Sequence, residues 1–156
     1  MAIERVKNYF RQFNIEHRII ELKESSATVE LAALALGCEG KRIAKTLSFK
    51  VDNQVLLVVC AGDAKIDNVK FKDTFGVKPK MLSIEEVEPL IGHDIGGVCP
   101  FGINEGIDVY LDCSLKRFDS VYPACGSSNS AIELTLDELN EYSKSIQWVD
   151  VCKNWE

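Results

Sequence analysis

Apolar residues recur at helical spacing in the first thirteen positions, where they stand three or four residues apart. This pattern predicts an amphipathic helix carried by Ile3, Val6, Tyr9, Phe10 and Phe13. A short strand is expected over residues 16–22. A second helix is predicted over 25–37, because hydroxyl residues precede its apolar run, Glu30 lies early and Gly37 ends it. Ala27 or Thr28 is expected near its start.

The middle of the chain alternates between strand and helix patterns. Residues 42–62 contain two β-rich runs that meet at Asp52–Asn53, a turn signal typical of a hairpin. Helices are predicted over 66–76, with Asp67 or Asn68 near the cap, and over 83–92. In the second of these helices, Ser83 and Glu86 have the spacing of a capping box.

The last third predicts strands over 106–114 and 130–136, then a helix over 135–144 that begins with a second capping box, Thr135 and Glu138. Residues 146–152 add a strand or simply pack against the rest. Strands interleave irregularly with helices, so the order does not follow a βαβ repeat. It favours an α+β fold with a mixed or antiparallel sheet.

Length and composition point to a single domain over residues 1–156, long enough for one sizeable core. No apolar run approaches the roughly 18 residues that cross a bilayer, and the charged N-terminus lacks the pattern of a signal peptide. We therefore expect a cytoplasmic protein without a membrane partner.

The net charge of −6 argues against a general nucleic-acid binder, and no DNA partner is expected. The stretch 65–80 differs from the rest of the chain in charge, because it contains five lysines and two aspartates. It is either a solvated helix face or a local phosphate-binding patch. Its lysines are Lys65, Lys70, Lys72, Lys78 and Lys80.

Six cysteines and two histidines give no metal-binding spacing, since no CxxC pair occurs. The cysteines are best explained as small buried apolar residues in a reducing compartment. Neither a metal nor an organic cofactor is expected. Walker, dinucleotide-binding and GxSxG motifs are also missing from the sequence.

Three features carry candidate chemistry. The stretch "HDIGGVCPFG" (93–102) is a tight turn, a thiol site built from Cys99 and His93, or a backbone cradle whose N–H groups hold an oxyanion. Lys45, at the entrance of a predicted strand, is either a surface charge or a group that positions a phosphate or ester oxygen. "YPACGSSN" (122–129) is a second glycine loop.

The order and flanks of these features resemble the YbaK/prolyl-tRNA synthetase-associated domain family over nearly the whole chain. The similar stretches are "TVELAALALG", "RIAKTLSFK", "VLLVVCAGDAKID", "IGGVCPFG", "VYLDCSLKRFDSVYPACGSSNSAIELT" and "LDEL". Lys45 and the G-x-x-x-P element from Gly96 to Pro100 are the most specific marks. The resemblance implies a mixed α+β fold with a partly barrel-like central sheet and flanking helices.

The resemblance also implies a free-standing hydrolase that deacylates mischarged aminoacyl-tRNA, chiefly tRNA(Pro) carrying a small wrong amino acid, with a synthetase as a further partner. The catalytic residues that it implies are Lys45, Gly96, Gly97, Val98, Cys99 and Pro100, the loop acting through its backbone. The implied substrate-binding residues are Thr28, Gly126, Ser127 and Ser128. The lysines implied in tRNA contact are Lys65, Lys70 and Lys72.

Two alternatives stay open at this point. One is a non-catalytic module that binds tRNA or protein on the same fold. The other is a thiol enzyme that uses Cys99 and His93. The sequence does not specify the amino acid removed, since alanine, cysteine, serine, threonine and small non-protein amino acids all suit the family.

Overall fold

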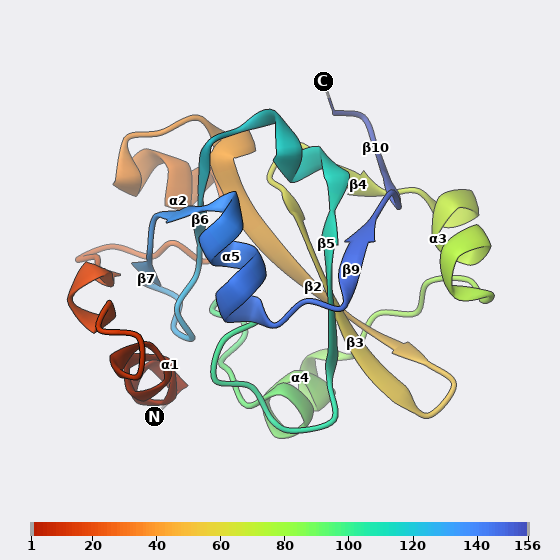
Figure 1. The fold of residues 1–156 in the computed structure, drawn as a ribbon, viewed down its shortest axis with the longest axis horizontal. Coiled ribbons are helices and arrows are strands. Elements are labelled where there is room, and N and C mark those ends of the chain that lie inside the picture. Colours follow the sequence, from red (N-terminus) through yellow and green to blue (C-terminus); the bar gives the residue numbers. More distant parts are fainter. Residues whose placement is uncertain (1, 156) are drawn as a thin grey trace.

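A curled six-stranded sheet forms the centre of the computed structural model, which describes residues 2–155 (Figure 1). The strand order is β8-β6-β2-β3-β5-β9. β2 and β3 are antiparallel, β6 and β8 are antiparallel, and the remaining neighbours are parallel. The expected α+β class with a mixed, partly barrel-like sheet is therefore confirmed. The strands are β2 (Ile43–Val51), β3 (Gln54–Ala61), β5 (Asp108–Asp112), β6 (Ser120–Pro123), β8 (Leu134–Thr135) and β9 (Gln147–Val149).

Five α-helices surround the sheet: α1 (Ala2–Arg11), α2 (Val29–Leu36), α3 (Asn68–Phe75), α4 (Ile84–Ile91) and α5 (Leu136–Ser143). Their starts follow the sequence signals, because Thr28, Asp67, Ser83 and Thr135 are N-caps, and both predicted capping boxes form. The 3₁₀ turns are η1 (Glu16–Arg18), η2 (Gly40–Arg42) and η3 (Cys113–Arg117).

Two small antiparallel pairs complete the fold. β1 (Ile20–Glu21) pairs with β7 (Ser130–Ala131), and β4 (Lys65–Ile66) pairs with β10 (Cys152–Lys153). The predicted hairpin forms around Asp52, whose φ of 55° suits a tight two-residue turn. The predicted strand over 16–22 is mostly wrong, since η1 occupies its first half. The predicted strand over 130–136 divides into β7 and β8.

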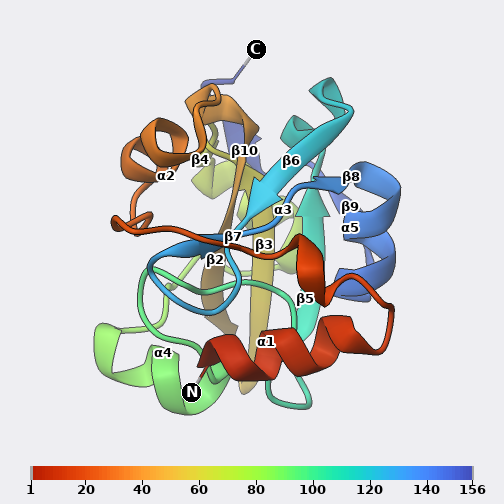
Figure 2. The same cartoon turned by 90° about the vertical axis from the view of Figure 1, so that its left-hand side faces the viewer.

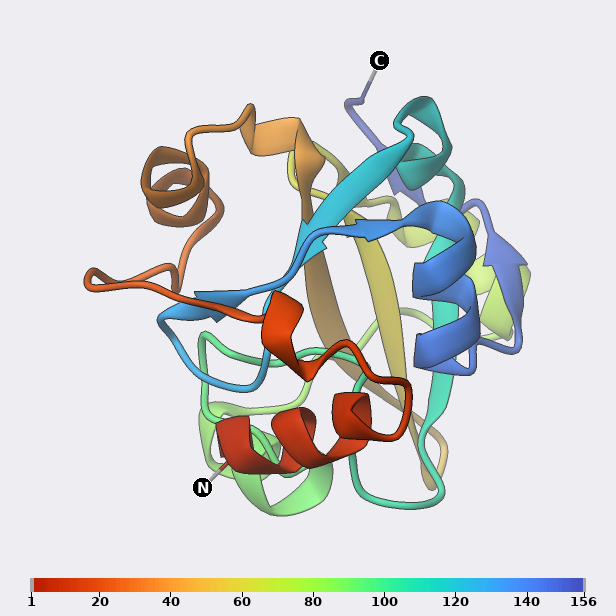
Figure 3. The same ribbon diagram turned by 60° about the vertical axis from the view of Figure 1, so that its left-hand side comes forward.

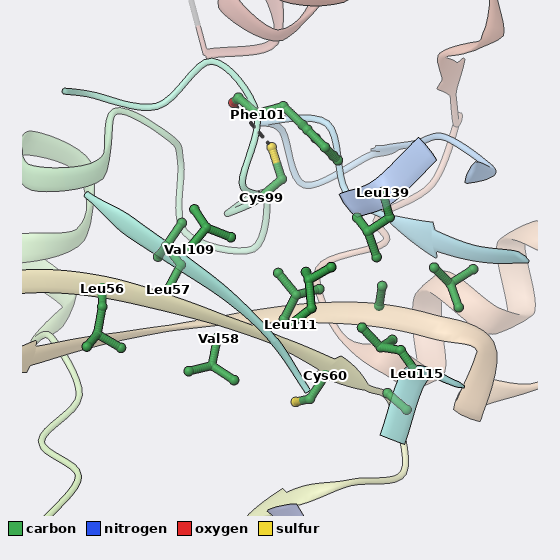
Figure 4. Packing of buried hydrophobic residues seen from close by; sticks show 14 of the residues in the cluster. Leu56, Leu57, Val58, Cys60, Cys99, Phe101, Val109, Leu111, Leu115 and Leu139 are labelled. Carbon is green, nitrogen blue, oxygen red and sulfur yellow. Dashed lines mark hydrogen bonds between the residues drawn. The ribbon is translucent and has the colours of Figure 1, made fainter. Parts of the chain in front are cut away.

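The sheet is buried on both faces. Figure 4 shows Leu57 and Leu111 on the side where Leu139 of α5 packs, while Val58 and Cys60 point to the other side. This alternation follows from the two-residue period of a strand. On the second side, α3 covers the sheet through a ring contact of 4.9 Å between the centroids of Phe49 and Phe71, the latter on α3.

Helix α1 lies beneath the loops that contain Gly102 and Gly126 (Figures 2 and 3). A Cβ on Gly126 would lie 2.9 Å from the carbonyl oxygen of Ala2, and one on Gly102 would lie 3.0 Å from that of Arg5. Glycine therefore permits the close approach of both loops to the helix. Among the described helices, none combines the length and apolar character needed to cross a membrane.

Candidate active site

A cavity of about 280 Å³ lies where the first residues of β2 face α2 and the 94–98 loop. Its wall is mostly apolar, with small residues such as Ala44 and Ala131 leaving the space open. Lys45 contributes the one charged side chain among the described lining residues. An apolar hollow with a few polar groups is the usual form of a site for a small molecule or for the end of a larger one.

The cavity opens onto a free edge of β2. Strand β6 pairs with β2 only at Ile43 and Ala44. Further along the same edge, the carbonyl of Ser48 accepts from Leu82 N–H and the N–H of Lys50 donates to Lys80. Lys45, Thr46 and Leu47 lie between these two pairings and all three line the cavity.

Lys45 reaches the cavity from the half-buried part of β2, where it pairs across the strands with Cys60. Its Nζ donates a long hydrogen bond, 3.4 Å, to the carbonyl oxygen of Gly62 just beyond β3. The turn at Gly62 is tightly packed, because a Cβ there would lie 2.0 Å from the carbonyl oxygen of Gly40. The ammonium is therefore held by one weak bond on a rigid support, with donors left for a ligand.

The 94–98 loop forms the opposite wall. Gly96 adopts a φ of 88°, and a Cβ there would lie 2.9 Å from the Cβ of Ala27. Both observations require glycine at this position. The N–H of Gly97 donates to Asp94, and the carbonyl of Gly97 accepts from Gly126, so this residue is engaged within the protein. Gly96 and Val98 are the loop residues that line the cavity.

The predicted site residues separate into two groups. The cavity brings together Thr28, Lys45, Gly96 and Val98. The second group does not line the cavity. Pro100 borders a separate hollow of about 240 Å³, beside Tyr9. This second group consists of Gly97, Cys99, Pro100, Gly126, Ser127 and Ser128.

Cys99 does not line the cavity, and its side chain lies in the buried core (Figure 4). Its thiol donates to the carbonyl oxygen of Phe101 at 3.6 Å and lies 3.5 Å from Nε2 of His93. Burial raises the pKa of the Cys99 thiol to about 12, so it stays protonated at neutral pH. The Cys99–His93 pair exists, but its burial does not support the thiol enzyme.

Several cavity residues were not predicted from the sequence, among them Ser26, Thr46, Tyr122 and Ser130. Ser130 lies in β7, whose neighbours Ser127 and Ser128 were predicted instead. Oγ of Ser127 forms a hydrogen bond of 2.7 Å with Oγ of Ser130, which connects a predicted residue to the cavity lining. The position of Thr46 beside Lys45 was the one available signal for it.

The basic segment covers β4, α3 and the residues that follow α3, where Lys78 and Lys80 lie. Lys65 is exposed, and its pairing register places it opposite Lys153. Lys70 is engaged, since Nζ contacts Asp150 at 3.1 Å and the carbonyl oxygen of Cys152 at 3.0 Å. Lys72 is exposed on α3.

One group of described residues has ligand atoms close enough for a metal: Asp112, Cys113 and Asp150, within 4.8 Å of one another. The two carboxylate oxygens of Asp112 already accept N–H groups of Ser114 and Val151, each at 2.9 Å. These bonds cap η3 and fix the tail of the chain, which explains the buried carboxylate structurally.

A model of the aminoacyl-tRNA editing domain matches residues 23–142, a stretch that includes every residue of this cavity. The chain belongs to the aminoacyl-tRNA editing domain family. This membership agrees with the resemblance found in the sequence. Lys45 and the 94–98 loop both lie within the matched stretch.

Relatives of this chain include a protein matched over its whole length and a much longer ligase. The chain is 57% identical to the uncharacterized protein YwhH of Bacillus subtilis (strain 168) over the full length of both chains. It is 31% identical to a proline–tRNA ligase of Bacillus cytotoxicus over 79% of this chain, which corresponds to 22% of the ligase.

The fold has a solved counterpart at 29% identity. That structure, of a proposed trans-editing enzyme for prolyl tRNA synthetase, superposes with a TM-score of 0.88 over 97% of both chains. The agreement in fold extends beyond the stretch matched by the family model.

Proposed function

We propose that this protein is a trans-acting deacylase that hydrolyses mischarged aminoacyl-tRNA, with tRNA(Pro) bearing a small wrong amino acid as the substrate. The observation that carries the proposal is the cavity that joins Lys45 to Gly96 and Val98 in a chain of the editing family. The relatives add support, because they include a proline–tRNA ligase and a proposed trans-editing enzyme.

The reaction is the hydrolysis of an ester. Water attacks the carbonyl carbon, the bond from that carbon to the ribose oxygen breaks, and a proton from the water passes to the ribose oxygen. The products are the free amino acid and the uncharged tRNA. Negative charge develops on the carbonyl oxygen during attack, and each well-placed donor to it contributes about 3–4 kcal/mol.

In our proposal, Lys45 and the 94–98 loop contact different parts of the ester substrate. The ammonium of Lys45 holds the terminal phosphate or the ester oxygen, and the backbone of Gly96 and Val98 faces the carbonyl. No cysteine or histidine stands among the described residues of the lining. We therefore infer that water is the nucleophile and that a ribose hydroxyl of the substrate assists it.

In this proposal, the exposed lysines contact the tRNA body. Lys65 and Lys72 are available, whereas Lys70 is engaged by Asp150. Because the chain is acidic overall, we expect modest tRNA affinity that falls steeply with salt. A synthetase that presents the charged tRNA in the cytoplasm would compensate for this weak binding.

The test is deacylation of a panel of tRNA(Pro) esters by the wild-type protein and Lys45→Ala. We expect hydrolysis of at least one small aminoacyl ester and a loss of about 100-fold or more in Lys45→Ala. Lys116→Ala, which removes an exposed lysine outside the cavity lining, serves as the control. Binding of tRNA without hydrolysis, unaffected by Lys45→Ala, would favour the non-catalytic module instead.

A further inference from the structure

Thr46 has a feature that sets it apart among the serine and threonine residues of the cavity lining. Oγ1 of Thr28 accepts the N–H of Leu31 as a helix cap, and Oγ of Ser26 bonds to Ser128. Oγ of Ser130 bonds to Ser127. In the described part of the chain, Oγ1 of Thr46 is buried and has no hydrogen-bond partner.

An unpartnered buried hydroxyl costs free energy that a valine of the same shape would avoid. Among the described residues, no side chain or main-chain group of the lining forms a hydrogen bond with this hydroxyl. We therefore expect the hydrogen-bond partner of this hydroxyl to be a bound ligand.

Thr46 stands at the centre of the free edge of β2. Since Ser48 and Lys50 direct their main-chain groups away from β3, the two-residue alternation directs those of Thr46 to the same edge. Thr46 thus brings its N–H and its carbonyl to the open edge of the strand, next in sequence to Lys45.

The hydroxyl is buried, yet it can be presented to a ligand at little cost. Rotation of about 120° about χ1 exchanges Oγ1 with the methyl group, which has nearly the same size, and moves between staggered rotamers. Because Oγ1 has no partner, this rotation breaks no hydrogen bond.

A neutral hydroxyl suits this position better than a cation. Among the described lining residues none is an aspartate or glutamate, and Lys45 places a positive charge on the same stretch of β2. An ammonium group at Thr46 would therefore find no counter-charge in the lining. A hydroxyl can donate to Oγ1 or accept from it.

We infer that Thr46 is a specificity-determining residue that selects aminoacyl groups with a side-chain hydroxyl, seryl or threonyl, over alanyl. This inference rests on the proposed deacylase function and narrows its substrate class. A site with a hydrogen-bonding group for a substrate hydroxyl discriminates against the analogue that lacks it, since the group is then left unpaired.

The experiment compares seryl-, threonyl- and alanyl-tRNA(Pro) as substrates of the wild-type protein, Thr46→Val and Thr46→Ser. Valine keeps the shape and removes the hydroxyl, whereas serine keeps the hydroxyl. We expect the wild type to prefer seryl or threonyl esters. In Thr46→Val we expect the ratio of seryl or threonyl hydrolysis to alanyl hydrolysis to fall about tenfold or more. Thr46→Ser retains the preference.

Binding of the 3′-seryl and 3′-alanyl amides of 3′-amino-3′-deoxyadenosine, measured by calorimetry, provides a readout that needs no turnover. A wild type that prefers alanyl esters, or a Thr46→Val loss that is equal for all esters, overturns the inference and leaves the proposed deacylase intact. Failure of every ester to be hydrolysed overturns both. Thermal melting of Thr46→Val shows whether its loss of activity comes from unfolding. If it does, the ester preference of Thr46→Ser decides whether the inference holds.

Discussion

The N–H of Gly126 donates a hydrogen bond of 2.9 Å to the carbonyl oxygen of Gly97, and this bond joins the two glycine loops back to back. A Cβ on Gly97 would lie 2.4 Å from the amide nitrogen of Ser127, so the loops meet without room for a side chain. The cavity wall at Gly96 and Val98 is thus supported by Gly126 and Ser127 of the second loop, which do not themselves line the cavity.

Alanine substitutions at Gly96 and at Gly106 together test the role of the cavity wall, with Gly106 as the control. Both have positive φ, 88° and 84°, but a Cβ on Gly96 meets Ala27, whereas a Cβ on Gly106 meets nothing within 4 Å. Each alanine substitution costs about 1–2 kcal/mol of backbone strain, and Gly96→Ala adds a further clash.

We therefore expect Gly96→Ala to lose both stability and deacylation, and Gly106→Ala to lose stability alone. Urea unfolding and a deacylation assay measure the two effects. Equal deacylation by both variants would contradict a role for the Gly96 backbone in the site.

Cys99→Ala tests the thiol directly. Because the thiol is fully buried and its pKa is raised to about 12, we expect deacylation to be unchanged and stability to fall by about 1 kcal/mol from the lost packing. In the native wild type, iodoacetamide should react first with the half-buried Cys38 and Cys113. Loss of deacylation in a folded Cys99→Ala would restore the thiol alternative.

His93 predicts a dependence of stability on pH. Burial lowers the pKa of His93 below its ordinary 6.5, so the folded state disfavours the proton that the unfolded chain accepts. Stability from this group is therefore complete above about pH 6.5 and falls as the pH decreases through that value.

Urea unfolding at about pH 8 and about pH 5.5 measures this difference. His93→Gln should be less stable at both values, because the bond from Nε2 to the Phe101 carbonyl is altered, and should show a smaller difference between them. His17→Gln, at an exposed position, is the control and should keep the wild-type difference. An unchanged difference in His93→Gln would assign the effect to other groups.

The sequence predicts local structure well where a single side chain decides it. Caps at Thr28, Asp67, Ser83 and Thr135 and the turn at Asp52 depend on neighbouring residues only, and all five form. Strand β6 was missed because four residues beside a 3₁₀ turn give no clear alternation.

Site geometry was less predictable because it depends on tertiary contacts. The glycine loops were identified, but which residues line the cavity depends on how Gly97 and Gly126 pack against each other. Thr46 could not be singled out, since its importance comes from a free strand edge and an unpartnered hydroxyl, which only the assembled sheet reveals.

The position of α1 affects where the boundaries of such a domain are drawn. The matched family stretch begins at residue 23, whereas the helix that supports Gly102 and Gly126 ends at Arg11. A fragment cut to the matched stretch would expose the underside of both loops to water. The unit that keeps the cavity in shape is therefore longer than the stretch by which the family is recognised, and an editing module grafted into another protein needs α1 or a substitute surface.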